Sequence, residues 1–167
     1  ILLMIDDVMK FDYKMIGDIT EYTMKDFIIF IENRTEKTIP KILLSTSGGS
    51  GEAATGIKDY CSAHKIAFDC YCIGKVESAG IVILAAATKK ISYKNCIFMV
   101  HNPIAGNGSR YNQWRHRKKL RLYIKLLEKI TPNILLRSRP TYLTSYEALA
   151  EKLIDKLNIP EINRKRR

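Results

Sequence analysis

Hydrophobic positions in the first part of the chain switch between helical and strand patterns. Apolar residues recur at helical spacing within 21–33, and the polar segment 35–40 that follows ends in proline. The short apolar run 41–45 then indicates a buried strand, and helical spacing resumes from Ala53 to Cys61 after a serine- and glycine-rich turn. The pattern therefore predicts a helix, a strand, a glycine turn and a second helix in succession.

The same order of elements repeats directly afterwards. Residues 68–73 are a second buried-strand candidate, Gly74 is expected to turn the chain, and residues 78–88 are small and apolar on all sides, as in a central helix. Residues 97–100 predict a third strand. We therefore expect an α/β fold with two successive βαβ units and right-handed crossovers. A chain of 167 residues that is 46% hydrophobic can bury one core, so a single domain over 1–167 is expected.

The chain after residue 101 is more polar and more basic. A long basic helix is expected from Tyr111 to about Ile130, where Thr131-Pro132 ends it, and a capping box formed by Thr144 and Glu147 predicts a last helix to about Leu153.

The net charge of +11 is compatible with a protein that binds nucleic acid. Much of the excess lies in 110–121 and in the basic tail 163–167, without the interleaved aromatic residues of an RNA-binding sheet. We therefore favour a solvated helix face and a frayed tail, and nucleic-acid binding stays as an alternative.

Other features exclude several classes of site. The four cysteines have no CxxC spacing and are interpreted as reduced core residues, and the three histidines lack the spacing of a zinc site, so no metal or cofactor is expected. The longest apolar run, 81–87, is far shorter than the roughly 18 to 20 residues of a membrane span, so the chain is expected to be soluble with no membrane partner. Because it begins at Ile1, it is interpreted as a processed or truncated form.

Candidate catalytic residues lie where predicted strands end. Ser78 begins a buried helix, where free N–H groups and the helix dipole favour developing negative charge. The amides of Ala79 and of the Gly48-Gly49 turn are possible donors to an oxyanion, and His101 follows a strand end. Each feature alone is more often structural, and it is their order and spacing that indicate acyl transfer.

These motifs resemble the Clp protease proteolytic subunit, ClpP. The resemblance covers roughly 14–159 and depends on three segments. They are Leu43–Ser50, Ile73–Ala86 and Met99–Pro103. It implies a crotonase/ClpP-like superhelix of repeated βαβ units with a C-terminal handle helix, at about 104–131 here. It also implies Ser78 as nucleophile, His101 as general base, and the amides of Gly49 and Ala79 as the oxyanion hole.

The third catalytic residue of that family is an aspartate just before an aromatic-leucine pair, here Tyr142-Leu143. Residues 137–141 read Arg-Ser-Arg-Pro-Thr, and no aspartate occurs between Asp69 and Asp155. Asp155 falls in a segment that the family also has after the site, so the third member is missing. Asn133 and Glu128 remain as substitutes.

Three further side chains oppose catalysis. Arg137 and Arg139 bring positive charge where the family has a carboxylate, and this disfavours the imidazolium that His101 must form. Glu77 places an anion beside the expected oxyanion.

In the resembled family the handle stacks two seven-membered rings. Here the handle is short and basic, so like charges would repel across a two-fold interface. A single homo-heptameric ring, or a ring shared with a different subunit, is therefore expected in preference to a homomeric double ring.

The leading hypothesis is a ClpR-like subunit of an ATP-dependent Clp serine protease complex, inactive or impaired, and structural or regulatory in a heteromeric ring. The resemblance implies a catalytic ClpP paralogue, an AAA+ Clp unfoldase and unfolded protein substrates as partners. The Ile-, Lys- and Asn-rich composition, together with the plastid occurrence of such paralogues, suggests a plastid or apicoplast, and otherwise the cytoplasm. The alternatives are an active ClpP-type serine endopeptidase, a crotonase-like enzyme of acyl-CoA chemistry that holds an enolate near Gly49 and Ala79, and the nucleic-acid binder.

Overall fold

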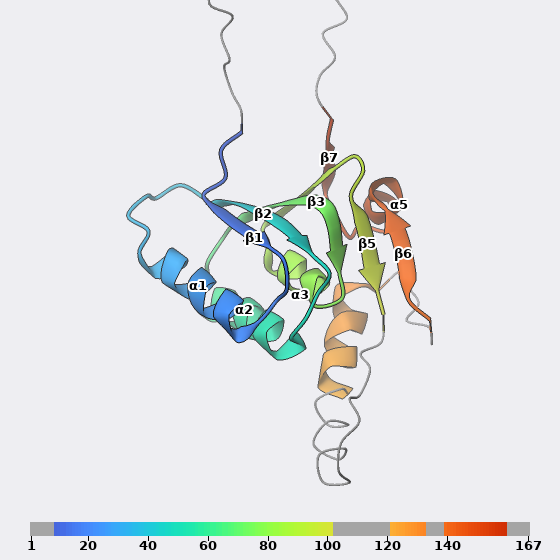
Figure 1. Cartoon of the computed structure of the whole chain (residues 1–167), viewed down its shortest axis with the longest axis horizontal. Helices are drawn as coiled ribbons and strands as arrows, with labels where there is room; N and C mark the ends of the chain where they lie inside the picture. Colours follow the sequence, from blue (N-terminus) through green and yellow to red (C-terminus); the bar gives the residue numbers. More distant parts are fainter. Residues whose placement is uncertain (1–8, 102–120, 133–138, 160–167) are drawn as a thin grey trace, which may run out of the picture.

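The computed structural model describes residues 9–101, 121–132 and 139–159. Strands and helices alternate through the first hundred residues, and two short strands and a short helix follow nearer the C-terminus (Figure 1). The elements are β1 (Tyr13–Ile16), α1 (Glu21–Glu32), β2 (Lys41–Thr46), α2 (Gly51–Ala63), β3 (Asp69–Glu77), α3 (Ala79–Ala86), β4 (Lys89–Tyr93), β5 (Ile97–Val100), β6 (Thr141–Thr144), α5 (Ser145–Ala150) and β7 (Lys156–Asn158). Residues 121–130 are also helical.

The described strands form one sheet in the order β1-β2-β3-β4-β7, while β5 pairs with β3, and β6 with β5. Every pair is parallel except β5 with β6. The α/β prediction with successive βαβ units is therefore confirmed. Strands β1, β4, β6 and β7 are additions that the hydrophobic pattern did not predict.

The expected turn at Gly74 is wrong. Strand β3 continues through it to Glu77, with Gly74 at φ +68 inside the strand. The register with β2 shifts there, from Leu44 opposite Cys72 to Thr46 opposite Val76. Glycine thus forms a bulge, which bends β3 away from β4 and lets its second half pair with β5. This bend carries the end of β3 toward the end of β5.

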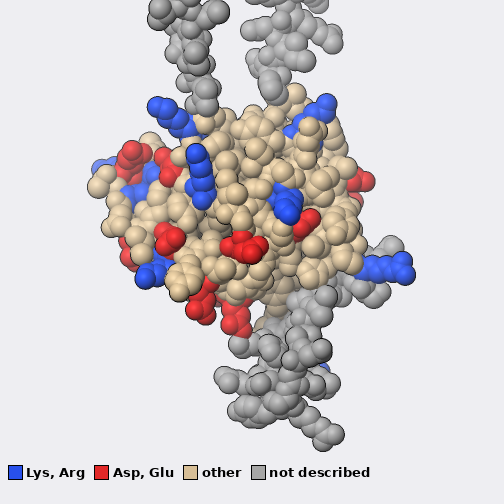
Figure 2. Space-filling model, in the orientation of Figure 1, with Lys and Arg blue, Asp and Glu red and all other residues tan. Residues whose placement is uncertain are grey.

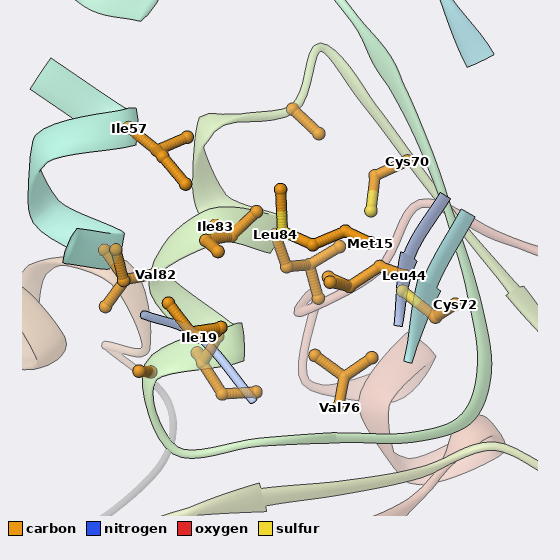
Figure 3. Packing of buried hydrophobic residues seen from close by; sticks show 14 of the residues in the cluster. Met15, Ile19, Leu44, Ile57, Cys70, Cys72, Val76, Val82, Ile83 and Leu84 are labelled. Atoms are coloured by element: carbon orange, nitrogen blue, oxygen red, sulfur yellow. The ribbon is translucent and has the colours of Figure 1, made fainter. Parts of the chain in front are cut away.

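Helix α3 is the centre of the core. It contacts α2 on one side and β2, β3 and β5 on the other. Figure 3 shows Ile83 and Leu84 between Ile57 of α2 and the strand residue Leu44, with Val82 below Ile57, and all five are at most 1% exposed. Because α3 is packed on both sides, the positions of its two ends are fixed. The residue that precedes α3 is therefore fixed as well.

The predicted helix boundaries are largely confirmed. Thr144 and Glu147 form the expected capping box, with the Thr144 N–H donating to the Glu147 carboxylate at 2.7 Å. Helix α5 nevertheless ends at Ala150 and not near Leu153. The basic helix ends at 130, as Thr131-Pro132 predicted, and its expected first part lies outside the described residues.

The four cysteines are free and buried, which confirms their interpretation as reduced core residues. Burial raises the pKa of Cys61 to about 11 and that of Cys96 to about 12. No helix in the described part of the chain is long and apolar enough to cross a membrane.

Most of the net positive charge lies outside the described residues, which carry 18 basic and 14 acidic side chains and so account for +4 of the total of +11. On the face shown in Figure 2 the two signs are interspersed, with acidic side chains near the centre. That face offers no continuous basic surface for a polyanion.

Candidate active site

Ser78 lies in the tight connection between β3 and α3. Its backbone adopts φ 53 and ψ −118, outside the regions that residues with a side chain favour, which costs about 1–3 kcal/mol. The conformation is held by two hydrogen bonds: the Ser78 N–H donates to the Met99 carbonyl at 2.9 Å, and the Ile81 N–H donates to the Ser78 carbonyl at 3.0 Å. The Ser78 side chain does not cap α3, so its hydroxyl is directed elsewhere.

His101 follows the last residue of β5. Strands β3 and β5 are parallel, with Glu77 opposite Met99, so Ser78 and His101 emerge at the same sheet edge. His101 Nε2 lies 2.8 Å from Ser78 Oγ. When Nε2 accepts this hydrogen bond, the imidazole proton resides on Nδ1, and the ring is the tautomer that can take the serine proton.

Gly48 lies directly against Ser78, a role that the sequence did not single out. A Cβ atom at Gly48 would lie 2.6 Å from Ser78 Cβ and 3.2 Å from Ser78 Oγ, and the backbone has φ +104. Only glycine fits this contact without a shift. Thr46, which is 1% exposed, fixes the turn by accepting the Gly48 N–H at 2.9 Å.

Gly49 forms a parallel bridge with Ile19. The Ile19 N–H donates to the Gly48 carbonyl and the Ser50 N–H donates to the Ile19 carbonyl, both at 2.8 Å. In such a bridge the central residue directs its own N–H to the opposite side, so the Gly49 amide points away from Ile19.

Ala79 is the first residue of α3, and its N–H has no carbonyl partner within the helix. The two predicted oxyanion donors, Gly49 and Ala79, thus directly follow Gly48 and Ser78, two residues that lie against each other. Their role as an oxyanion hole stays a prediction.

The register of β5 and β6 shows what lies beside His101. Val100 is opposite Thr141 and Met99 is opposite Tyr142. Because the pairing is antiparallel, one further step places Pro140 opposite His101. Pro140 is exposed, and its side chain carries no group that can accept a hydrogen bond from Nδ1.

Carboxylates elsewhere in the described residues do not hydrogen-bond or pair with His101. Asp155 accepts the Lys90 N–H at 2.7 Å near the start of β4, and Glu128 is exposed on the 121–130 helix. Of the other residues considered, Asn133 and Arg137 lie outside the described part of the chain, and Arg139 is exposed.

Glu77 is only partly exposed and its neighbour Val76 is buried, at 0%. Since side chains alternate along a strand, Glu77 leaves β3 on the face opposite Val76 and therefore opposite α3. Solvent screens a carboxylate in that position, so its effect on an oxyanion is smaller than the sequence alone suggested.

Tyr123 is a further residue near this region that sequence reasoning missed. Its ring approaches Gly51, the first residue of α2, and a Cβ there would lie 2.9 Å from it. Its hydroxyl is buried without a partner among the described residues, and burial raises the pKa of Tyr123 to about 12. A helical tyrosine in a basic segment gives no signal of this placement in the sequence.

Groups of three or more metal-binding side chains are absent from the described part of the chain. The groups that the structure brings together at the site are a serine hydroxyl, an imidazole and backbone amides. Together these can support proton transfer from Ser78 Oγ to His101 Nε2 and stabilisation of an oxyanion.

The chain is similar to known proteins of one family. The model of the Clp protease family matches residues 8–159. The ATP-dependent Clp protease proteolytic subunit of Bdellovibrio bacteriovorus is 32% identical over 111 residues, which cover 62% of this chain and 50% of the relative. The chain thus spans about half the length of that curated relative.

Among solved structures, a mutant of ClpP1 from Listeria monocytogenes has a similar fold, with a TM-score of 0.70 and 20% identity over 87% of this chain and 89% of the other. This likeness confirms the ClpP-like fold. With the family match over most of its length, the chain belongs to the Clp protease family, as a protein like its proteolytic subunits.

Proposed function

We propose that this chain is a subunit of a Clp proteolytic ring in which its own peptidase activity is absent or strongly impaired, and that it acts structurally or as a regulator of catalytic subunits. The observation that carries the proposal is Pro140 opposite His101, within the segment 137–141 that by the resemblance stands where the family has its aspartate and that contains no carboxylate. The name of the curated relative, an ATP-dependent proteolytic subunit, supports an AAA+ unfoldase as the partner that delivers unfolded protein.

The groups that remain at the site, Ser78 and His101, explain why we expect the peptidase activity to be impaired. During acylation His101 takes the Ser78 proton and becomes an imidazolium, which an aspartate would orient and stabilise. In a chymotrypsin-type protease, loss of this orientation lowers kcat by about 10⁴, or about 5.5 kcal/mol. The Ser78–His101 hydrogen bond and the N-terminus of α3 still contribute to lowering the reaction barrier, but this contribution is smaller.

The direct test is labelling of Ser78 with a fluorophosphonate, followed by mass spectrometry. We expect slow labelling of the unaltered chain, none after Ser78→Ala, and a rate at least about 10-fold higher after Pro140→Asp, which introduces a carboxylate opposite His101. Pro140→Asn is the matched control, because it removes the proline without adding the charge.

Fast stoichiometric labelling of the unaltered chain would contradict impairment. Equal rates for Pro140→Asp and Pro140→Asn, with both variants folded, would contradict the assignment of position 140.

A second candidate, an active serine endopeptidase, is favoured by one observation: Ser78 keeps its strained conformation and its 2.8 Å hydrogen bond to His101. In this case a partner subunit or a residue outside the described part orients the imidazole. It predicts hydrolysis of a fluorogenic peptide that is lost in both Ser78→Ala and His101→Ala.

The assembly is part of the same proposal. We expect rings shared with a catalytic ClpP paralogue, because the basic segment 110–121 disfavours contact between identical handles. Native mass spectrometry of the chain alone and mixed with the paralogue tests this, and a stable homomeric fourteen-mer would contradict it. The composition supports a plastid or apicoplast location, which microscopy of the tagged full-length protein checks.

A further inference from the structure

A pocket lies at the end of α3 that is remote from Ser78. It has a volume of about 280 Å³ and is lined by Ala85 near the C-terminal end of α3, whereas Ser78 precedes its N-terminal end. An eight-residue helix separates the two by about 12 Å. The pocket is therefore distinct from the serine–histidine site.

Four lysines from four different segments line this pocket. Lys58 comes from α2, Lys90 from β4, Lys129 from the 121–130 helix and Lys152 from the turn after α5. None of them forms an ion pair with an acidic side chain in the described part of the chain. Four lysines in one lining that contains no acidic residue favour an anionic ligand.

No acidic side chain is among the residues that line the pocket. Asp155, whose carboxylate accepts the backbone N–H of Lys90 at 2.7 Å, lies outside this lining. Glu128 and Glu151 are sequence neighbours of Lys129 and Lys152 but are not among the lining residues.

The rest of the lining is aliphatic. Ala85, Leu126, Ile130 and Leu153 contribute to the wall, Leu153 is only 5% exposed, and no aromatic side chain is present in the lining. A nucleotide base would be expected to need an aromatic or planar partner for stacking. Aliphatic walls instead fit an alkyl group, and lysines bind an anionic head as point charges without a required planar shape.

We propose that this pocket binds an aliphatic carboxylate, with the alkyl part against Leu126 and Leu153 and the carboxylate among Lys58, Lys90, Lys129 and Lys152. The volume lies near the lower end of the roughly 300–1,000 Å³ of small-molecule sites, so the ligand is small. Two sources share this chemistry: a short fatty acid and the C-terminal carboxylate of a peptide that ends in leucine.

The test is isothermal titration calorimetry of the full chain with octanoate, and separately with a leucine-terminated tripeptide in its free-acid and amidated forms. We expect saturable binding of octanoate or of the free-acid peptide, no binding of the amide, and weaker binding as salt is raised. Whichever ligand binds identifies the source.

Exposed lysines make suitable variants. Lys129→Gln with Lys152→Gln is expected to weaken binding about 5- to 30-fold, because two charges are removed. Lys125→Gln is the matched control: it removes a charge from the same helix but not from the pocket lining, and binding should stay within about two-fold. Ala85→Leu fills the pocket without changing its charge and should abolish binding, with melting temperature reporting whether the variant folds.

Three outcomes would overturn the proposal. The first is that neither octanoate nor the free-acid peptide binds. The second is that the Lys125 change weakens binding as much as the Lys129 and Lys152 changes. The third is that acetate binds with the same affinity as octanoate, which would show that the aliphatic wall has no role.

Discussion

Glycines 17 and 48 provide a matched pair that tests the contact at Ser78. Both have nearly the same positive φ, +105 and +104, a region that residues with a side chain avoid, so alanine at either position carries a backbone strain of about 1–2 kcal/mol. The surroundings differ, because a Cβ at Gly17 meets nothing within 4 Å whereas one at Gly48 lies 2.6 Å from Ser78 Cβ.

The contact at Gly48 adds to the strain. Carbon atoms pack at about 3.5–4.0 Å, so Ser78 must move by roughly 1 Å, and overpacking of this kind costs about 1–3 kcal/mol. Urea unfolding should therefore show Gly48→Ala destabilised by about 1–3 kcal/mol more than Gly17→Ala. A 1 Å displacement can reduce reactivity about 100-fold, so Ser78 labelling in the Pro140→Asp background should fall by a similar factor for Gly48→Ala only.

Equal unfolding energies for the two alanine variants would refute the close contact between Gly48 and Ser78. Unchanged labelling in Gly48→Ala, with a large loss of stability, would show that the Ser78–His101 geometry does not depend on the turn.

The remaining predictions concern stability. Phe27→Ala should cost about 3–5 kcal/mol in urea unfolding because its ring is 0% exposed, whereas Tyr22→Ala, 79% exposed, should stay within about 0.5 kcal/mol. Thr144→Ala should cost about 1 kcal/mol through loss of the capping box, and Thr144→Ser should restore most of it. For Cys61 the folded pKa is raised to about 11 from 9.0, so its stabilising contribution is complete below about pH 9 and is lost as the pH rises through 11. At pH 8 its reaction with a disulfide reagent should be far slower in the folded than in the urea-unfolded chain; equal rates would contradict the burial of this thiol.

The sequence predicted the placement of those site residues that lie at the ends of strands. His101 comes directly after an apolar strand, and Ser78 comes directly after β3, whose last residues, Gly74 to Glu77, the pattern did not assign to a strand. Parallel strands end at a common edge, so the order of elements indicated that both residues lie at that edge. The same reasoning failed at Gly74, where a glycine that resembled a turn signal is a bulge within β3. The prediction failed because the bulge depends on the pairing of β3 with both β4 and β5, and this long-range pairing cannot be read from the local sequence.

Long-range pairing also explains the other features that the sequence did not show. Strand β6 is four residues long and half exposed, and only its antiparallel register with β5, across about forty residues, places Pro140 opposite His101. Likewise the four lysines that line the pocket at the C-terminal end of α3 come from segments spread between Lys58 and Lys152 and share no local pattern. Such sites become visible only when the sheet order and helix packing are known.

The contacts that hold Ser78 in place are separate from the surroundings of position 140. This separation makes the proposed non-catalytic subunit physically reasonable. Ser78 is held by the Met99 carbonyl, by the first turn of α3 and by the Gly48 turn, and none of these contacts involves a residue of β6. Pro140, by contrast, is exposed beside the first residue of β6 and supports no buried side chain. A substitution at 140 is therefore expected to leave the core undisturbed, whereas a substitution at Gly48 disturbs the contact with Ser78. A chain without a carboxylate at this edge can thus keep the fold on which the proposed assembly with other subunits would depend.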